Sequence, residues 1–204
     1  SNTGFFGLPV AISLFPESTV SIFLFTILGM TFFENSLGYY FVAKNQMSTR
    51  EVLLKIIRLP TLYAVTTAII INILDIQVPD YIFNMNLYIR GAYITLGMMN
   101  IGISLSQIKS FRFGKRFLTL TLGNKFIAWP AAIGALLVLD TTTLHLFNHA
   151  QHSVFLLTAI VPLASNSVVF AQLFDMHPEK MGAAVLISTV LALGYIPLIC
   201  AWFM

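Results

Sequence analysis

The side chains best suited to chemistry are small polar residues that interrupt an apolar stretch in the last quarter of the chain. Pro162 is followed there by Ser165, Asn166 and Ser167. Proline removes a backbone donor and clashes with the preceding helical turn, so a helix must kink or break at this point. The polar side chains that follow can hydrogen-bond the freed backbone groups or a bound solute.

A second interruption lies at the start of the chain, where Asn2 and Thr3 precede Gly4, Gly7 and Pro9. Glycine and proline permit the backbone to unwind here as well. Two interrupted apolar segments in corresponding positions of two halves are typical of the binding site of a secondary transporter. The alternative is a pair of kinked packing helices in which asparagine forms interhelical hydrogen bonds.

The solute expected at such a pair of interruptions is an anion. The N-terminus of a half-helix carries unpaired N–H groups and the positive end of the helix dipole. Asn2 and Asn166 add neutral donors beside them. This arrangement favours a carboxylate and does not require a buried cation.

Two ionisable residues lie deep in apolar stretches. At about 1.5 Å per residue, Glu34 lies about 15 Å from the basic connector that begins at Lys44, and Lys125 lies at a comparable depth beyond Arg116. Ionisable groups at this depth are costly and are functional candidates by default. Glu34 could carry a coupling proton, and Lys125 could attract an anionic substrate. The alternative is a structural ion pair between the two, or contacts with neighbouring asparagines.

Neither a metal site nor a cofactor is expected. His145, His149 and His152 could share a helix face, but a fourth ligand is not evident, and a solvated outer loop is the favoured interpretation. The single cysteine, Cys200, excludes a disulfide framework and a cysteine-rich metal site. The sequence contains no phosphate-binding loop, which argues against ATP-driven transport.

The composition places the chain in a membrane. Of its 204 residues, 57% are hydrophobic and 9% are charged, and the mean hydropathy is +0.85. A typical soluble domain carries about 25% charged residues. A soluble enzyme, a nucleic-acid-binding module and a disordered chain are therefore excluded.

The elements that must position the polar residues are membrane helices, because a spanning helix needs about 17–25 residues and the apolar stretches are near that length. These stretches predict an all-α polytopic membrane protein with about seven transmembrane helices: Ser1–Phe15, Thr19–Ala43, Leu59–Ile76, Leu87–Ser106, Phe117–Leu139, Ser153–Phe174 and Met181–Met204. The first stretch spans only about 22 Å of the roughly 30 Å hydrocarbon core, so we expect the chain to begin inside a membrane helix.

Basic residues occur in alternate connectors. Two connectors hold most of them: Lys44, Arg50, Lys55 and Arg58 in one, and Lys109, Arg112, Lys115 and Arg116 in the other. The connectors at 75–86 and 140–152 contain neither lysine nor arginine. The positive-inside rule places the basic connectors in the cytoplasm, which puts the C-terminus outside the cell (inner) membrane.

A short internal similarity suggests a repeat. Ser1–Thr3 resembles Ser165–Ser167, and Leu14–Glu17 resembles Leu173–Glu179 with extra residues. The implied period is five helices, and an odd number of crossings gives the two copies opposite orientations. We therefore expect residues 1–43 to end a first inverted repeat, 44–58 to form a cytoplasmic connector and 59–204 to form the second repeat.

The same segments resemble a known family. Asn-Thr-Gly-Phe-Phe-Gly-Leu-Pro at residues 2–9 resembles the fourth-helix signature of the auxin efflux carrier family, which includes plant auxin exporters and bacterial malonate and other organic-acid permeases. Further similar segments are 54–60, 76–79, 101–105, 164–171 and 183–193. The resemblance implies ten helices in two inverted five-helix repeats with crossed, broken fourth and ninth helices. This chain would hold helices four to ten and lack about the first three, and Asn2 and Pro162–Asn166 would match the crossing.

The sequence thus favours a secondary carrier that moves small organic anions across the bilayer by alternating access. A coupling ion, H⁺ or Na⁺, and a homodimer remain open. The alternatives are a non-transporting membrane receptor or scaffold, or an inactive truncated carrier; a channel is less favoured because the sequence lacks a filter-like motif.

Overall fold

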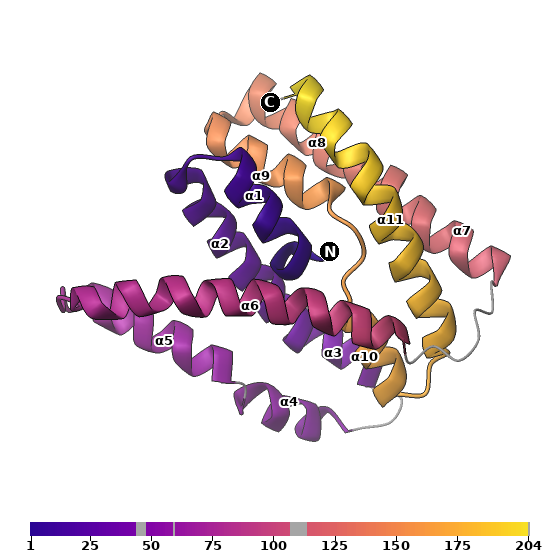
Figure 1. The fold of residues 1–204 in the computed structure, drawn as a ribbon, viewed down its shortest axis with the longest axis horizontal. Helices are drawn as coiled ribbons and strands as arrows, with labels where there is room; N and C mark the ends of the chain where they lie inside the picture. Colours follow the sequence, from indigo (N-terminus) through magenta and orange to yellow (C-terminus); the bar gives the residue numbers. More distant parts are fainter. Residues whose placement is uncertain (44–47, 59, 107–113, 204) are drawn as a thin grey trace. The chain divides into compact units, whose positions relative to one another are not determined.

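Every regular element in the described part of the chain is helical. The computed structural model describes residues 1–43, 48–58, 60–106 and 114–203 (Figure 1). The α-helices are α1 (Leu8–Leu14), α2 (Glu17–Phe33), α3 (Tyr39–Ala43), α4 (Thr49–Ile57), α5 (Pro60–Ile73), α6 (Asp80–Ser106), α7 (Lys115–Gly123), α8 (Trp129–Leu139), α9 (His149–Ile160), α10 (Asn166–Leu173) and α11 (Pro178–Phe203). The π-helical turns are η1 (Thr3–Gly7), η2 (Glu34–Gly38), η3 (Asn124–Ala128) and η4 (Asp140–Leu144).

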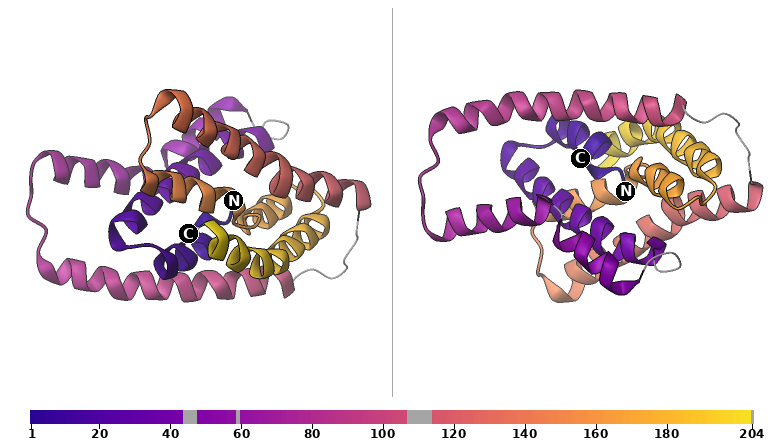
Figure 2. Two further views of the ribbon diagram at one scale, coloured as in Figure 1. Left: turned by 90° about the horizontal axis from the view of Figure 1, so that it is seen from above. Right: turned by 90° about the horizontal axis from the view of Figure 1, so that it is seen from below.

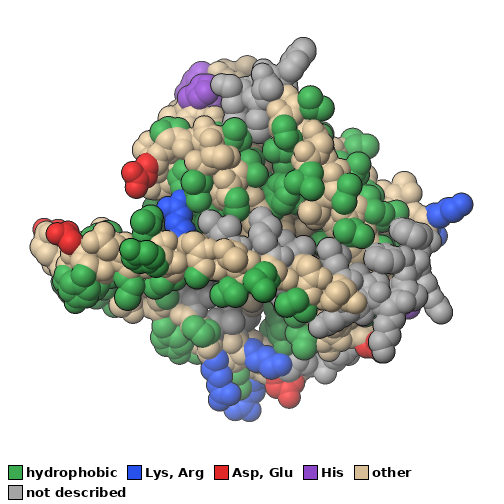
Figure 3. Space-filling model, in the orientation of Figure 1, with side chains coloured by type: hydrophobic (Ala, Val, Ile, Leu, Met, Phe, Trp, Pro, Cys, Tyr) green, Lys and Arg blue, Asp and Glu red, His purple; other side chains and the backbone are tan. Residues whose placement is uncertain are grey.

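Three described helices are long and apolar enough to cross a membrane: Glu17–Ala43, Lys115–Leu144 and Pro178–Ile199. Two shorter apolar helices, Thr3–Leu14 and Tyr63–Ile73, accompany them. Large apolar side chains point outward, with Phe25 75% exposed, and hydrophobic side chains cover much of the face in Figure 3. An outward apolar surface of this kind is typical of contact with lipid. The all-α membrane class is supported, whereas the count of seven spans and the ten-helix repeat stay predictions.

The chain divides into two compact units, residues 1–27 with 97–204 and residues 28–96. The boundaries fall inside α2 and α6, so a continuous helix enters each unit from the other. The first unit contains residues 1–27 of the segment predicted to end the first repeat, together with most of the second predicted repeat. The predicted repeat boundaries at 43 and 59 are therefore not tested by this division.

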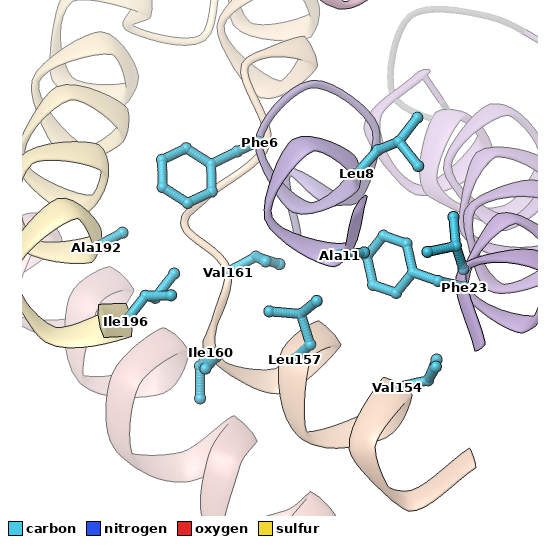
Figure 4. Close-up of a cluster of buried hydrophobic side chains, with 11 residues drawn as sticks. Phe6, Leu8, Ala11, Phe23, Val154, Leu157, Ile160, Val161, Ala192 and Ile196 are labelled. Carbon is cyan, nitrogen blue, oxygen red and sulfur yellow. The ribbon is translucent and has the colours of Figure 1, made fainter. Parts of the chain in front are cut away.

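The core of the first unit lies where the N-terminal helices meet α9 and α11 (Figure 4). Phe6 and Ala11 of η1 and α1 pack with Leu157 and Val161, and Ile196 of α11 closes the cluster. These side chains are large and apolar or small enough for close approach, so they exclude water from the end of α9. The unwound segment after α9 thus begins within a dry core.

The start of the chain corrects one prediction. Gly4, Gly7 and Pro9 were expected to let the backbone unwind, but Gly7 N–H donates to the Asn2 carbonyl at 2.9 Å and closes a π turn. Pro9 follows this π turn inside the continuous helix Thr3–Leu14, so the proline does not end the helix. Glycine at position 7 serves close packing instead, since a Cβ there would meet the buried Phe23 ring at 2.8 Å.

The predicted connector at 44–58 contains the helix α4, and its place on the cytoplasmic side stays a prediction. Ser48 and Glu51 form reciprocal hydrogen bonds at the start of α4, the pattern of a capping box. The sequence Ser-Thr-Arg-Glu before an apolar run is the signal that predicts this start. Lys44, Lys109 and Arg112 lie outside the described residues.

Candidate functional site

The predicted break at Pro162 is confirmed. Helix α9 ends at Ile160 and α10 begins at Asn166, and Val161 between them has an extended backbone with φ −59° and ψ 150°. Both views in Figure 2 place the N-terminus of the chain beside this unwound segment. A non-helical backbone at membrane depth must find new hydrogen-bond partners, and the residues that supply them define the candidate site.

Neighbouring elements pair with the backbone of the unwound segment from two sides. Asn2 N–H donates to the Pro162 carbonyl at 2.8 Å. The N–H of Leu163 donates to Oγ of Ser188 on α11 at 3.1 Å, and Ser188 is fully buried. The start of the chain and α11 therefore hold the break open in a fixed conformation.

The carboxyl end of α9 has two further partners. Lys125 Nζ donates to the Ala159 carbonyl at 3.1 Å and to Ser1 Oγ at 2.8 Å, and this lysine is only 6% exposed. Tyr195 Oη on α11 donates to the Ile160 carbonyl. A cation beside the last carbonyls of a helix is favoured by the helix dipole, which explains how a lysine is accommodated among apolar residues.

Two side-chain polar atoms at the break are buried without a hydrogen-bond partner among the described residues. They are Asn2 Nδ2 and Ser165 Oγ, on residues that are 4% and 3% exposed. A buried unsatisfied donor costs about 1–3 kcal/mol. Such groups in a native fold require an explanation, and a bound solute is a direct one.

The other predicted binding residues take different positions. Asn166 is the first residue of α10 and is exposed, so it lies in a wetter environment than Asn2 and Ser165. Ser167 donates back to the Ala164 carbonyl, which stabilises the first turn of α10. Thr3 is buried and begins η1 together with Gly4. The structure brings Asn2, Thr3 and Gly4 to the break, whereas their role in binding stays a prediction.

Glu34 belongs to the second unit, where it begins the π turn η2 within electrostatic range of Tyr93. Lys125 belongs to the first unit and contacts Ser1 and Ala159. The predicted pairing of Glu34 with Lys125 stays a prediction.

Several contacts were missed by sequence reasoning. Ser188 and Tyr195 pair with the break, and the available signal was a polar group on each in the long apolar helix, where it requires a partner. In the connector at 140–152, Asp140 is 1% exposed and accepts hydrogen bonds from Leu146 N–H at 2.9 Å and Phe147 N–H at 3.3 Å. His152 Nε2 lies 2.8 Å from Asp140 Oδ2.

The last of these contacts corrects the interpretation of the histidines. His145 and His149 are exposed, as expected of a solvated loop, but His152 is largely buried against Asp140. Its ring closes the loop that connects α8 to α9.

The chain is similar to two archaeal proteins. It is 26% identical over 201 residues to an uncharacterized transporter of Methanocaldococcus jannaschii, and 27% identical over 202 residues to an uncharacterized transporter of Methanothermobacter thermautotrophicus. Each match covers 97% of this chain and 63% of the relative, so the chain spans less than two thirds of the length of these relatives. No family model and no solved structure matches. The apolar helices and these relatives together support an integral membrane protein.

Proposed function

We propose that the protein is a secondary carrier of small organic anions, with its substrate site at the break between α9 and α10. The observation that carries the proposal is a buried set of donors at one broken helix. Asn2 Nδ2 and Ser165 Oγ have no hydrogen-bond partner among the residues that the structure describes, and the Lys125 ammonium lies against the same helix end. The names of the two archaeal relatives support transport in general.

The chemistry of the donors favours an anion. An asparagine amide nitrogen and a lysine ammonium are donors only, and a serine hydroxyl can donate as well. Lys125 donates to Ser1 and to Ala159. Ser1 precedes Asn2, which pairs with Pro162, and Ala159 lies in the last turn of α9 before the break. A carboxylate offers acceptor oxygens and a charge that compensates the ammonium. Small mono- and dicarboxylates are therefore the proposed substrates.

The proposed family is that of the auxin efflux carriers, on the resemblance of residues 2–9 and 164–171. The proposal includes the ten-helix architecture of two inverted repeats, the C-terminus outside the cell membrane, and alternating access in which one bundle moves against the other. The protein would catalyse no covalent reaction. Glu34 is the proposed carrier of a coupling proton, since a carboxyl group at membrane depth is rare without a role.

Solute counterflow tests the proposal directly. The full-length protein is reconstituted in proteoliposomes loaded with unlabelled malonate, and uptake of external labelled malonate is followed, with malate and an aromatic carboxylate as further solutes. A carrier gives transient, saturable accumulation of label that Ser165→Ala reduces. Thr189→Val is the matched control, because the Thr189 hydroxyl donates to the Val185 carbonyl within its own helix.

Other results would contradict the carrier. Flux that rises linearly with concentration and shows no counterflow indicates a channel. Binding without flux for any of these solutes indicates a receptor or scaffold that keeps the fold.

A further inference from the structure

An apolar groove of about 530 Å³ lies in the second unit, beside the amphipathic helix α4. Phe33, Leu37 and Tyr40 line it from the preceding membrane helix, and Val52 and Leu53 line it from α4. Leu37 and Leu53 are both more than half exposed. A groove of this volume is within the range that holds a small organic ligand or a lipid chain.

The same helix carries basic side chains. Arg50, Lys55 and Arg58 are exposed on α4 and at its end. Figure 3 shows Lys and Arg side chains gathered over α4, in the lower part of the view. Lys55 Nζ bonds Tyr39 Oη at 3.0 Å and lies 5.6 Å from that ring, which ties α4 to α3 next to the groove.

The one acidic residue of α4 is engaged in its own cap. The Ser48 backbone N–H, followed by the Ser48 hydroxyl, holds the pKa of Glu51 below its usual range. Glu51 is therefore ionised at neutral pH. Its negative charge lies at the start of α4, where it interacts favourably with the positive end of the helix dipole. The remaining face of α4 presents positive charge beside an apolar groove.

We propose that this groove binds an anionic phospholipid, with an acyl chain in the groove and the phosphate near Arg50 and Arg58. The charge pattern argues for this occupant. Basic residues on an amphipathic helix that follows a membrane helix on the cytoplasmic side match the negative charge of that leaflet. The apolar lining matches a hydrocarbon chain, and an interfacial helix lies at the depth where headgroups and chains meet. The proposal is independent of transport.

Native mass spectrometry of the delipidated full-length protein tests the site. Phosphatidylglycerol and phosphatidylcholine with identical chains are titrated separately, and the dissociation constants are compared. We expect phosphatidylglycerol to bind more tightly. The double variant Arg50→Gln/Arg58→Gln should weaken phosphatidylglycerol binding about 30-fold, since a basic side chain near an anionic surface contributes about a factor of five. Phosphatidylcholine binding should hardly change.

Two further variants distinguish binding in the groove from a nonspecific attraction of the lipid to basic side chains. Leu37→Trp fills the groove and should weaken both lipids. Lys115→Gln/Arg116→Gln removes an equal number of exposed basic residues from another connector and should change neither dissociation constant.

Three results would overturn the proposal. Equal affinity for the two lipids would show that the basic side chains do not recognise the anionic headgroup. Displacement of bound phosphatidylglycerol by soluble glycerol phosphate would show a phosphate site rather than a lipid site. Efficient cross-linking of Leu37→Cys to a second copy, with no lipid retained, would show that another chain covers the groove.

Discussion

At the scale of single residues, the positions around Pro162 divide into those that hold the break and those that are available to a solute. Ser188, Tyr195 and the backbone of Asn2 satisfy groups of the unwound segment. The side chains of Asn2 and Ser165 have buried polar atoms that remain unsatisfied among the described residues. The second group is where substitution should change binding more than stability.

Lys125 belongs to both groups, because it caps α9 and supplies the positive charge. Lys125→Met removes the charge and leaves the Ala159 carbonyl unpaired, so it should lower both anion affinity and melting temperature. Lys125→Arg keeps the charge but changes the hydrogen-bond geometry, so it should retain part of the anion affinity and part of the thermal stability. Isothermal titration and thermal melting on the same purified variants measure the two effects. Unchanged affinity in Lys125→Met would restrict this lysine to a structural role.

The exposure of Asn166 ranks it below Ser165. Ser165→Ala removes a buried hydroxyl and should weaken substrate binding about 5- to 150-fold, which corresponds to about 1–3 kcal/mol. Asn166→Ala should have a smaller effect, because water competes for an exposed amide. Asn166→Asp should weaken substrate binding more than Asn166→Ala does, since it places a negative charge near an anion. Equal losses for Ser165→Ala and the control Thr189→Val would contradict the assignment.

At the scale of helices, the π turns coincide with the polar residues that the sequence singled out. Thr3 begins η1, Glu34 begins η2 and Lys125 is the second residue of η3, whereas Asp140, which begins η4, was not among the residues singled out. A π turn widens the helix and is frequent at functional sites. The break at Pro162 could be predicted from sequence because proline has a local steric effect. The π turns could not, because nothing in the local residue types distinguishes them from an α-helical turn.

The same distinction holds for α4 and for the partners of the break. The capping pair Ser48 and Glu51 is a local signal, so the start of α4 could be predicted from the sequence. Ser188 and Tyr195 lie far along the chain from the residues that they contact, and only the packing of α11 against the break selects them. Tertiary contacts of this kind leave no periodicity in the sequence.

Asp140 and His152 form a latch, a hydrogen-bonded contact within the connector at 140–152. Asp140→Asn keeps the shape but loses charge and one acceptor, so it should destabilise the protein by about 1–3 kcal/mol. Asp75→Asn is a suitable control, because Asp75 is exposed and its positive φ is tolerated by asparagine. Thermal melting in one detergent at neutral pH compares them. Equal melting temperatures would show that the latch contributes nothing to stability.

At the scale of the whole molecule, the charge pattern of the connectors predicts the sidedness. Ser48 and Asn148 lie on opposite predicted sides, but both cap helices, so replacing either would disturb the fold. Arg50→Cys and His149→Cys probe the same connectors without removing a cap. In a Cys200→Ser background, a membrane-impermeant thiol reagent should label one from the cytoplasm and the other from outside. Labelling of both cysteines from the same side would contradict the predicted orientation, and with it the inverted repeat.

The membrane class follows from composition, because 9% charge cannot solvate a globule of this size, and the all-α architecture follows from the length of the apolar stretches. The arrangement of repeats does not follow in the same way, since three described helices meet the length of a span and the compact units mix the predicted repeats. The account therefore depends most on its central claim, that the break between α9 and α10 is where an anion binds.

Substrate protection of Ser165→Cys tests that claim most directly. In the Cys200→Ser background, the rate of thiol modification in proteoliposomes is measured against the concentration of the carboxylate that exchanges in counterflow, with His149→Cys as the control outside the site. The account predicts that the carboxylate slows modification of Ser165→Cys saturably, with a midpoint that matches its transport, and leaves the control unchanged. An unchanged rate at Ser165→Cys with a carboxylate that is transported would contradict it.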